Sequence, residues 1–220
     1  RITHIRQWSS PPGWLRFSVS LLLMLLNQRL SKPAGKIAKD KMNFRAIFYR
    51  LHIKLLEKAS NETKVRYLRR QGMKIGENCL IGTMNFSTEP YLIEIGDHVA
   101  IADDTEIVTH DGGVWCFRDE IKNADLFGRV KIGNNVFIGN NCTILPNTTI
   151  GDNCIIGSGS VLRGKFPENS VIVGNPAKVL MDIKVQKFLY KQNPDLLQTK
   201  HLSPAEKTRF IKRHFGLETD

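Results

Sequence analysis

The sequence is poor in cysteine and in long apolar runs, and each shortage excludes a class of protein. Four cysteines in 220 residues, with no C-x-x-C pair among them, do not make a disulfide framework. The strongest apolar run, FSVSLLLMLL at 17–26, has 10 residues, whereas a transmembrane helix needs roughly 18. No small-residue cleavage site follows it, since NQRLS comes next. We therefore interpret this run as either a buried helix or an interfacial one.

Charge is distributed unevenly, and its pattern divides the chain into three segments. Residues 1–74 carry 17 basic and 3 acidic residues, a net charge of +14. The net charge is −6 for residues 75–180 and +3 for residues 181–220. A basic arm on an acidic body is typical of a contact surface for anionic lipid, an acidic polymer or a protein partner. No nucleic-acid-binding module is recognisable, so we expect no nucleic-acid partner.

The N-terminal segment has helical patterns. Apolar residues at helical spacing predict an amphipathic helix over 43–58. A second helix is expected from about Glu62 to Gln71, ending at Gly72, because glycine readily adopts the left-handed conformation that ends helices. Residues 1–74 are therefore predicted to form a basic, mostly helical arm.

The C-terminal segment, 181–220, is also predicted to be helical. Ser203 has the position of an N-cap, Pro204 that of the first helical residue, and Glu206 completes a capping box. Gly216 is expected to end this helix.

Between these ends the sequence repeats every six residues. One aliphatic residue marks each repeat, and most are followed directly by glycine: Ile75, Ile81, Ile95, Ile101, Ile107, Ile132, Ile138, Ile144, Ile150, Ile156 and Leu162. Four residues further on, the side chains are small or β-branched: Cys79, Val99, Thr105, Val136, Cys142, Thr148, Cys154 and Ser160. This pattern predicts two inward-facing side chains in every six residues, which is typical of a short strand followed by a tight corner. Three such units close a coil of about 18 residues, and stacked coils form a parallel β-helix.

The six-residue register breaks twice. The step from Ile81 to Ile95 is 14 residues, and the step from Ile107 to Ile132 is 25. Loops that leave a solenoid cost little closure entropy, and binding and catalytic residues are commonly carried on such loops. We therefore expect the functional site in the loops 82–94 and 108–131.

Two segments of the repeat region carry a resemblance to a known family. VKIGNNVFIGNNCTILPNTTIGDNCIIGSGSVL and the closing VIVGNPAKVL resemble the hexapeptide-repeat acyltransferases, closest to sugar and polysaccharide O-acetyltransferases of the maltose and galactoside type. The resemblance covers roughly residues 75–182. It implies a mainly β fold with a left-handed parallel β-helix over 75–180 and the inserted loop 108–131. It also implies a homotrimer with active sites between subunits, and acetyl-CoA as cosubstrate without a metal.

His110 is the candidate catalytic residue. Acetyl transfer to a hydroxyl needs a base for the hydroxyl proton, and histidine suits this task near neutral pH. The resemblance implies that His110 is this base and that transfer is direct, without a covalent enzyme intermediate. Asp111 either orients the imidazole or simply begins the turn. The alternative for His110 is a surface histidine in an Asp–Gly turn, and His98, at a corner of a repeat, is expected to be structural or exposed.

Four loop residues are candidates for contact with the acceptor. Related sugar acetyltransferases place a substrate-contacting asparagine near Asn85, but Asn85 also fits a buried structural role. Glu89 and Tyr91 are predicted to line the acceptor pocket, or to form a corner. Trp115 either faces a sugar or packs against a neighbouring subunit.

The assignment of the coenzyme-binding residues rests on the resemblance alone. It implies that the pantetheine arm lies between two coils and that the nucleotide phosphates meet basic residues at the mouth of the groove. The candidates are Asn140, Gly157 and Ser158 along the groove, with Arg163, Gly164 and Lys178 at its mouth. The sequence departs from the family at Arg163, where relatives commonly have a hydroxyl residue.

The function predicted is acetyl-CoA-dependent O-acetylation of a carbohydrate: a sugar, a polysaccharide or a lipid-linked glycan. Such an enzyme is expected in the cytoplasm, with possible peripheral contact between its basic arm and an anionic membrane. N-acetylation of an amino sugar or a xenobiotic amine or alcohol is an alternative, and a non-catalytic trimeric scaffold is a weaker one. A zinc enzyme with three histidine ligands is disfavoured, because the repeats contain only His98 and His110.

Overall fold

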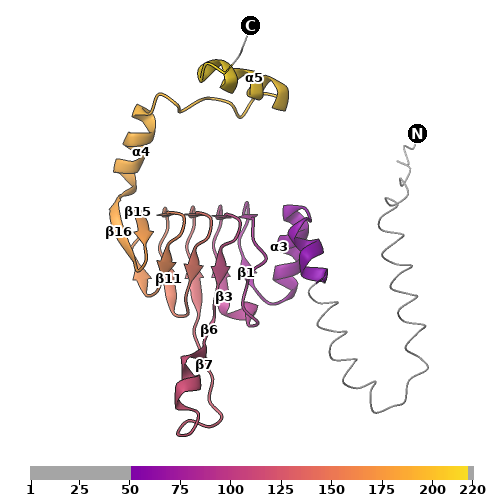
Figure 1. The fold of residues 1–220 in the computed structure, drawn as a ribbon, viewed down its shortest axis with the longest axis vertical. Coiled ribbons are helices and arrows are strands. Elements are labelled where there is room, and N and C mark those ends of the chain that lie inside the picture. Colours follow the sequence, from indigo (N-terminus) through magenta and orange to yellow (C-terminus); the bar gives the residue numbers. More distant parts are fainter. Residues whose placement is uncertain (1–50, 218–220) are drawn as a thin grey trace, which may run out of the picture. The chain divides into compact units, whose positions relative to one another are not determined.

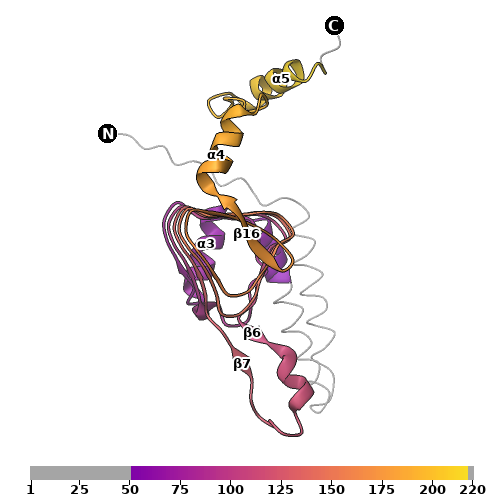
Figure 2. The same cartoon turned by 90° about the vertical axis from the view of Figure 1, so that its left-hand side faces the viewer.

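The computed structural model describes residues 51–217, in which short strands wind into a three-sided parallel β-helix (Figures 1 and 2). The first side contains β1 (Lys74–Ile75), β3 (Ile93–Ile95), β8 (Val130–Ile132), β11 (Thr148–Ile150) and β14 (Lys165–Phe166). The second contains β2 (Leu80–Ile81), β4 (Ala100–Ile101), β9 (Phe137–Ile138), β12 (Ile155–Ile156), β15 (Ser170–Gly174) and β16 (Ala177–Asp182). The third contains β5 (Glu106–Ile107), β10 (Thr143–Ile144) and β13 (Val161–Leu162). The apolar run at 17–26 and half of the helix predicted over 43–58 lie outside the described residues.

The stacking follows the six-residue repeat. Ile138 pairs with Ile156, and Ile144 pairs with Leu162, so each residue lies directly beside the one 18 positions later. All four of these side chains are fully buried. The core is a column of aliphatic side chains, and it is stable because each coil covers the apolar edge of the next. The predicted inward positions are confirmed.

The second inward position of each repeat is also buried. Cys79, Cys142 and Cys154 are buried free thiols, as their shared repeat position suggested, and burial raises the pKa of Cys79 and Cys154. Thr105 is buried as well, and its hydroxyl donates to the Gly139 carbonyl at 2.8 Å. Each of these residues is small or β-branched, so it is buried beside the larger aliphatic side chain of the same repeat.

The corners explain the glycine that follows most of the aliphatic residues. A Cβ atom at Gly139 would lie 2.7 Å from the backbone nitrogen of Ser158 on the next coil, which no side chain tolerates. Another corner position has a positive φ and is held by Asn135, Asn153 and Asn169 on successive coils. Their amides form a ladder, in which Asn135 donates to Asn153 at 2.9 Å and Asn153 to Asn169 at 3.1 Å. Asparagine suits both the left-handed backbone and the ladder.

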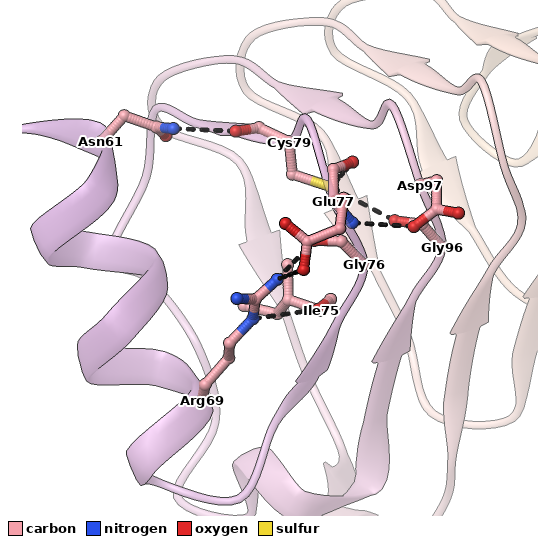
Figure 3. A network of polar contacts seen from close by, with 8 residues as sticks. All are labelled: Asn61, Arg69, Ile75, Gly76, Glu77, Cys79, Gly96 and Asp97. Atoms are coloured by element: carbon pink, nitrogen blue, oxygen red, sulfur yellow. Dashed lines mark hydrogen bonds and ion pairs between the residues drawn. The ribbon is translucent and has the colours of Figure 1, made fainter.

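Helix α3 (Asn61–Arg70) covers the first coil, as Figure 3 shows. The Asn61 amide donates to the carbonyl of Cys79 at 2.8 Å and accepts from the backbone nitrogen of Ile81 at 2.8 Å. Arg69 donates to the carbonyls of Ile75 and Gly76 at 3.0 and 2.7 Å. These side chains satisfy backbone groups at the open edge of the first coil, which otherwise is a template for pairing with another chain.

At its other end the coil leads into helices. The turn after Gly174 reverses the chain, so that β16 runs antiparallel to β15. Helix α4 (Ile183–Gln192) follows directly, and α5 (Pro204–His214) begins at the Ser203 capping box predicted from the sequence. The predicted helical C-terminal segment is thus present among the described residues, while the domain boundaries at 74 and 180 stay predictions.

The two register breaks take different forms. In the first, Phe86 forms a bridge with Ile107 and completes the third side of the first coil, after which the chain enters the short helix η1 (Pro90–Leu92). In the second, the chain leaves the coil altogether as a hairpin of β6 (His110–Asp111) and β7 (Leu126–Phe127), with η2 (Gly112–Phe117) between them (Figures 1 and 2).

Candidate functional site

The two register breaks meet where the hairpin leaves the coil. The backbone nitrogen of Thr109 donates to the Ser87 hydroxyl at 2.9 Å, which ties the base of the second loop to the first. The Gly128 nitrogen donates to the Thr109 carbonyl at 2.7 Å and closes the hairpin. His110, the first residue of the hairpin, is therefore held beside Glu89 in the first loop.

His110 and Glu89 form a hydrogen-bonded pair. His110 Nδ1 lies 3.0 Å from Glu89 Oε2, and the same oxygen accepts from the Thr109 hydroxyl at 2.8 Å. The other carboxylate oxygen accepts from the Thr88 hydroxyl at 2.5 Å. The hydrogen bond from Thr88, followed by those from His110 and Thr109, lowers the pKa of Glu89 to about 2. Glu89 is thus an anion near neutral pH.

The charge on Glu89 fixes the tautomer of His110. An ionised carboxylate can only accept a hydrogen bond, so Nδ1 of a neutral His110 carries the proton. Nε2 is then unprotonated, and it forms no hydrogen bond with any residue in 51–217. The Glu89 side chain is 14% exposed and that of His110 is 46% exposed. A nearly buried anion thus orients a half-exposed imidazole whose free nitrogen can accept a proton.

The Asp111 carboxylate does not contact the imidazole in this structure. Its Oδ1 accepts from the Gly113 nitrogen at 2.9 Å and so caps η2, while Oδ2 accepts from Arg163 Nη2 at 3.1 Å. The Gly113 hydrogen bond and, after it, the Arg163 guanidinium lower the pKa of Asp111. The residue that orients His110 is therefore Glu89, 21 positions away in the chain.

A cavity of about 250 Å³ lies over this pair. Its walls come from both loops: Thr88, Glu89, His110, Asp111, Gly112, Val114, Arg118, Asp125, Leu126 and Phe127. Arg118 is held within the hairpin, where it contacts the Ala124 carbonyl and pairs with Asp125 at 2.8 Å. The cavity thus combines carboxylates, one guanidinium and an apolar wall.

Of the four predicted acceptor residues, Glu89 alone is in that lining. Asn85 is exposed, so the alternative of a buried structural asparagine was wrong. Tyr91 and Trp115 are 64% and 77% exposed and stand away from the cavity lining. Sequence reasoning missed Thr88, Thr109, Arg118 and Phe127. Thr109 had a signal, because it continues the inward alternation from Ile107, but the other three depend on how the loops fold.

The predicted coenzyme residues lie on the late coils. Asn140 and Ser158 are exposed at one corner of adjacent coils, where the Gly159 nitrogen donates to the Asn140 carbonyl at 2.9 Å. Gly157, next to Ser158, faces Val173, whose partner across the β15–β16 pair is Lys178. Gly164 has a φ of 104° and follows Arg163 at another corner. The structure therefore brings Asn140, Gly157, Ser158 and Lys178 to one region and turns Arg163 toward Asp111.

Two larger hollows lie elsewhere on the coil. One, of about 550 Å³, lies between α3 and the first coil, where Arg69 is already bonded to backbone carbonyls. The other, of about 380 Å³, lies on the outer face of the six-stranded side and includes His98. His98 Nδ1 bonds to the Asn135 amide oxygen at 2.8 Å rather than to a carboxylate. Within residues 51–217 no cluster of His, Cys, Asp and Glu is placed to hold a metal ion.

Comparison with known proteins places this fold in a family. Residues 129–164 match the family model described as bacterial transferase hexapeptide (six repeats). Protein CapG of Staphylococcus aureus is 41% identical over 169 residues, which cover 76% of this chain and 95% of CapG. The chain therefore belongs to the hexapeptide-repeat acyltransferases, in the same family as CapG. The resemblance read from the sequence and the β-helix fold are confirmed, and the protein is an acyltransferase.

Solved structures of acetyltransferases are also similar to this chain. A maltose O-acetyltransferase from Clostridium difficile 630 is 29% identical, with 61% of this chain and 84% of that chain covered and a TM-score of 0.47. A galactoside acetyltransferase in complex with coenzyme A is 23% identical, with 63% and 82% covered and a TM-score of 0.47.

Proposed function

We propose that this protein transfers an acetyl group from acetyl-CoA to a hydroxyl group of a carbohydrate, with His110 as the general base. The observation that carries the proposal is the pairing of His110 Nδ1 with the ionised Glu89, 3.0 Å away. This pairing leaves Nε2 as a proton acceptor at the wall of a cavity formed by both loops. The choice of acetyl-CoA as donor follows the resemblance seen in the sequence.

The reaction balances with one residue as both base and acid. Nε2 of His110 takes the proton of the acceptor hydroxyl as its oxygen attacks the thioester carbonyl. The C–O bond forms, the C–S bond then breaks, and the departing thiolate takes the proton back from the imidazolium. Glu89 stabilises the imidazolium between these steps, because its negative charge lies against Nδ1. No covalent bond to the enzyme is required.

The wall of the cavity suits a carbohydrate. The carboxylates of Glu89, Asp111 and Asp125 are acceptors that hydroxyl groups can use. Leu126 and Phe127, which are 50% and 48% exposed, offer an apolar surface to the C–H face of a sugar ring. Asp111 and Asp125 are each paired with an arginine, so the charge of Glu89 remains, and it disfavours an acidic acceptor, since like charges repel. A neutral sugar residue is therefore the acceptor that this lining fits best.

We assign the donor to the groove region of the late coils. Asn140 and Ser158 are exposed at one corner, and Gly157, next to Ser158, lies against the side chain of Val173. Lys178 is exposed nearby on β16 and can meet a phosphate group.

Two variants test the proposal. Wild type, His110→Ala and His98→Asn are assayed for thiol release from acetyl-CoA with a panel of neutral sugars, acidic sugars and amines. We expect His110→Ala to lower turnover by about 10² or more, the scale of lost general-base catalysis. His98→Asn is the matched control, because asparagine fits both the positive φ at this corner and the amide ladder. Equal turnover by wild type and His110→Ala contradicts the role of His110, and turnover with amines alone contradicts O-acetylation.

The homotrimer, the cytoplasmic location and the contact of the arm 1–74 with anionic membranes also stay proposals. Light scattering of the full chain tests the first, and sedimentation with vesicles of anionic against neutral lipid tests the last. The net charge of +14 on residues 1–74 supports membrane contact. Within residues 51–217 no helix is long and apolar enough to cross a bilayer.

A further inference from the structure

We propose that Arg163 is a positioning residue for the acceptor site: it holds Asp111 and thereby fixes the hairpin that carries His110 against the coil. This inference rests on the proposed function, because it takes the cavity beside His110 as the acceptor site. It gives Arg163 a role other than the expected contact with coenzyme phosphate.

Arg163 lies on a later coil than the hairpin, and it reaches the hairpin only because its side chain is long. On the third side of the coil, β10 lies between β13 and β5. Arg163 directly follows β13, and the hairpin leaves the coil just after β5. Two strand spacings separate these levels, about 10 Å in all. The arginine side chain crosses the intervening coil and meets Asp111 Oδ2 with Nη2 at 3.1 Å.

Asp111 is suited to fix the hairpin because it makes two contacts at once. One oxygen caps η2 through the Gly113 nitrogen, and the other accepts from Arg163. The Asp111 side chain is 31% exposed, and that of Arg163 is 59% exposed. His110 is the preceding residue of the same strand, so a shift of Asp111 moves the imidazole and the cavity wall beside it. The pair joins the hairpin to a coil 52 residues later in the chain, whereas Glu89 joins it to the earlier loop.

The size of the effect follows from the exposure of the pair. Exposed ion pairs contribute up to about 1 kcal/mol, which corresponds to a factor of roughly five in a binding constant. We therefore expect loss of Arg163 to weaken acceptor binding a few-fold rather than to abolish activity.

The kinetic test separates positioning from phosphate binding. KM for the acceptor, KM for acetyl-CoA and kcat are measured for wild type, Arg163→Gln, Arg163→Lys and Asp111→Asn, with Lys165→Gln as the matched loss of a nearby exposed charge. We expect Arg163→Gln to raise the acceptor KM by about two- to fivefold with the acetyl-CoA KM unchanged. Arg163→Lys should restore part of the loss. A rise in the acetyl-CoA KM alone overturns the proposal.

A double-mutant cycle tests whether the two residues act as one unit. Asn at position 111 can still cap η2, so Asp111→Asn removes the ion pair while keeping the cap. We expect the double variant Asp111→Asn with Arg163→Gln to be no worse than either single variant, since contacting residues are not additive. Fully additive effects on the acceptor KM overturn the proposal.

A readout independent of catalysis keeps this inference separate from the proposed function. The hairpin contains Arg118 and Lys122, which are trypsin sites. Trypsin should cut there faster in Arg163→Gln than in wild type or Lys165→Gln, because the freed hairpin opens more often. Unchanged cutting rates contradict the proposal even if His110 is the base. If trypsin cuts Arg163→Gln faster than wild type while His110→Ala keeps full activity, the positioning role of Arg163 is supported. Only the assignment of His110 as the base is then contradicted.

Discussion

Two histidines of this protein have the same local chemistry and different surroundings. His98, at a corner of the coil, bonds through Nδ1 to the amide oxygen of Asn135 at 2.8 Å. His110, at the base of the hairpin, bonds through Nδ1 to the carboxylate of Glu89 at 3.0 Å. Both rings are oriented, and both residues are exposed. Orientation alone therefore does not distinguish a base from a structural histidine.

The difference lies in the charge of the partner. Asn135 is a member of the amide ladder, since its own amide donates to Asn153. A neutral amide offers no charge to balance an imidazolium. Glu89 is ionised and is held by two threonine hydroxyls, so its negative charge lies against the Nδ1 side of the His110 ring. At the corners of the regular coil, histidine occupies a position that asparagine holds elsewhere. The anion beside His110 is Glu89, which lies in the first register break.

The largest effect is expected in the coil itself, where packing rather than charge decides stability. Ile107 is fully buried on β5, next to the exposed Glu106. Ile107→Ala should lower the free energy of unfolding by about 2–5 kcal/mol, through lost burial and the cavity left behind. Glu106→Ala, the control, should change it by no more than about 0.5 kcal/mol. Chemical denaturation measures both, and equal losses contradict the two-sided pattern of the strand.

An intermediate effect is expected for a substitution of Glu89, the charged partner that distinguishes His110 from His98. Glu89→Gln removes the charge while keeping the size of the side chain. We expect kcat/KM to fall by about tenfold or more, because the imidazolium loses its counter-charge. Asn135→Ala removes the partner of His98 and should leave kcat/KM unchanged. A loss of activity in Asn135→Ala that equals the loss in Glu89→Gln contradicts the distinction.

The last effect is a pH dependence of stability. The pKa of Glu89 is about 2 in the folded chain against an ordinary value of 4.5, so its ionised form favours the folded state. That contribution is complete above about pH 4.5 and is lost as the pH falls toward 2. The difference in Tm between wild type and Glu89→Gln should therefore be constant above pH 5 and should shrink below pH 4.5. A difference that stays constant down to pH 2.5 contradicts the assigned charge.

The sequence by itself determined the coil. A six-residue period of aliphatic side chains forces burial at the same place in every repeat, and glycine at the tight corners and the Ser203 capping box are equally local signals. The period predicted the inward positions and located both register breaks. The period is the same for either hand of coil, so the prediction of a left-handed coil rests on the resemblance alone.

Only the tertiary structure decided which side chains meet in the site. The partner of His110 is Glu89 rather than the adjacent Asp111, and Asp111 is paired with Arg163, 52 positions later. Neither pairing follows from the six-residue period or from any regular spacing of residues in the sequence. Each arises because stacking brings remote loops to one corner of the coil, where the nearest opposite charge in space is not the nearest in the chain.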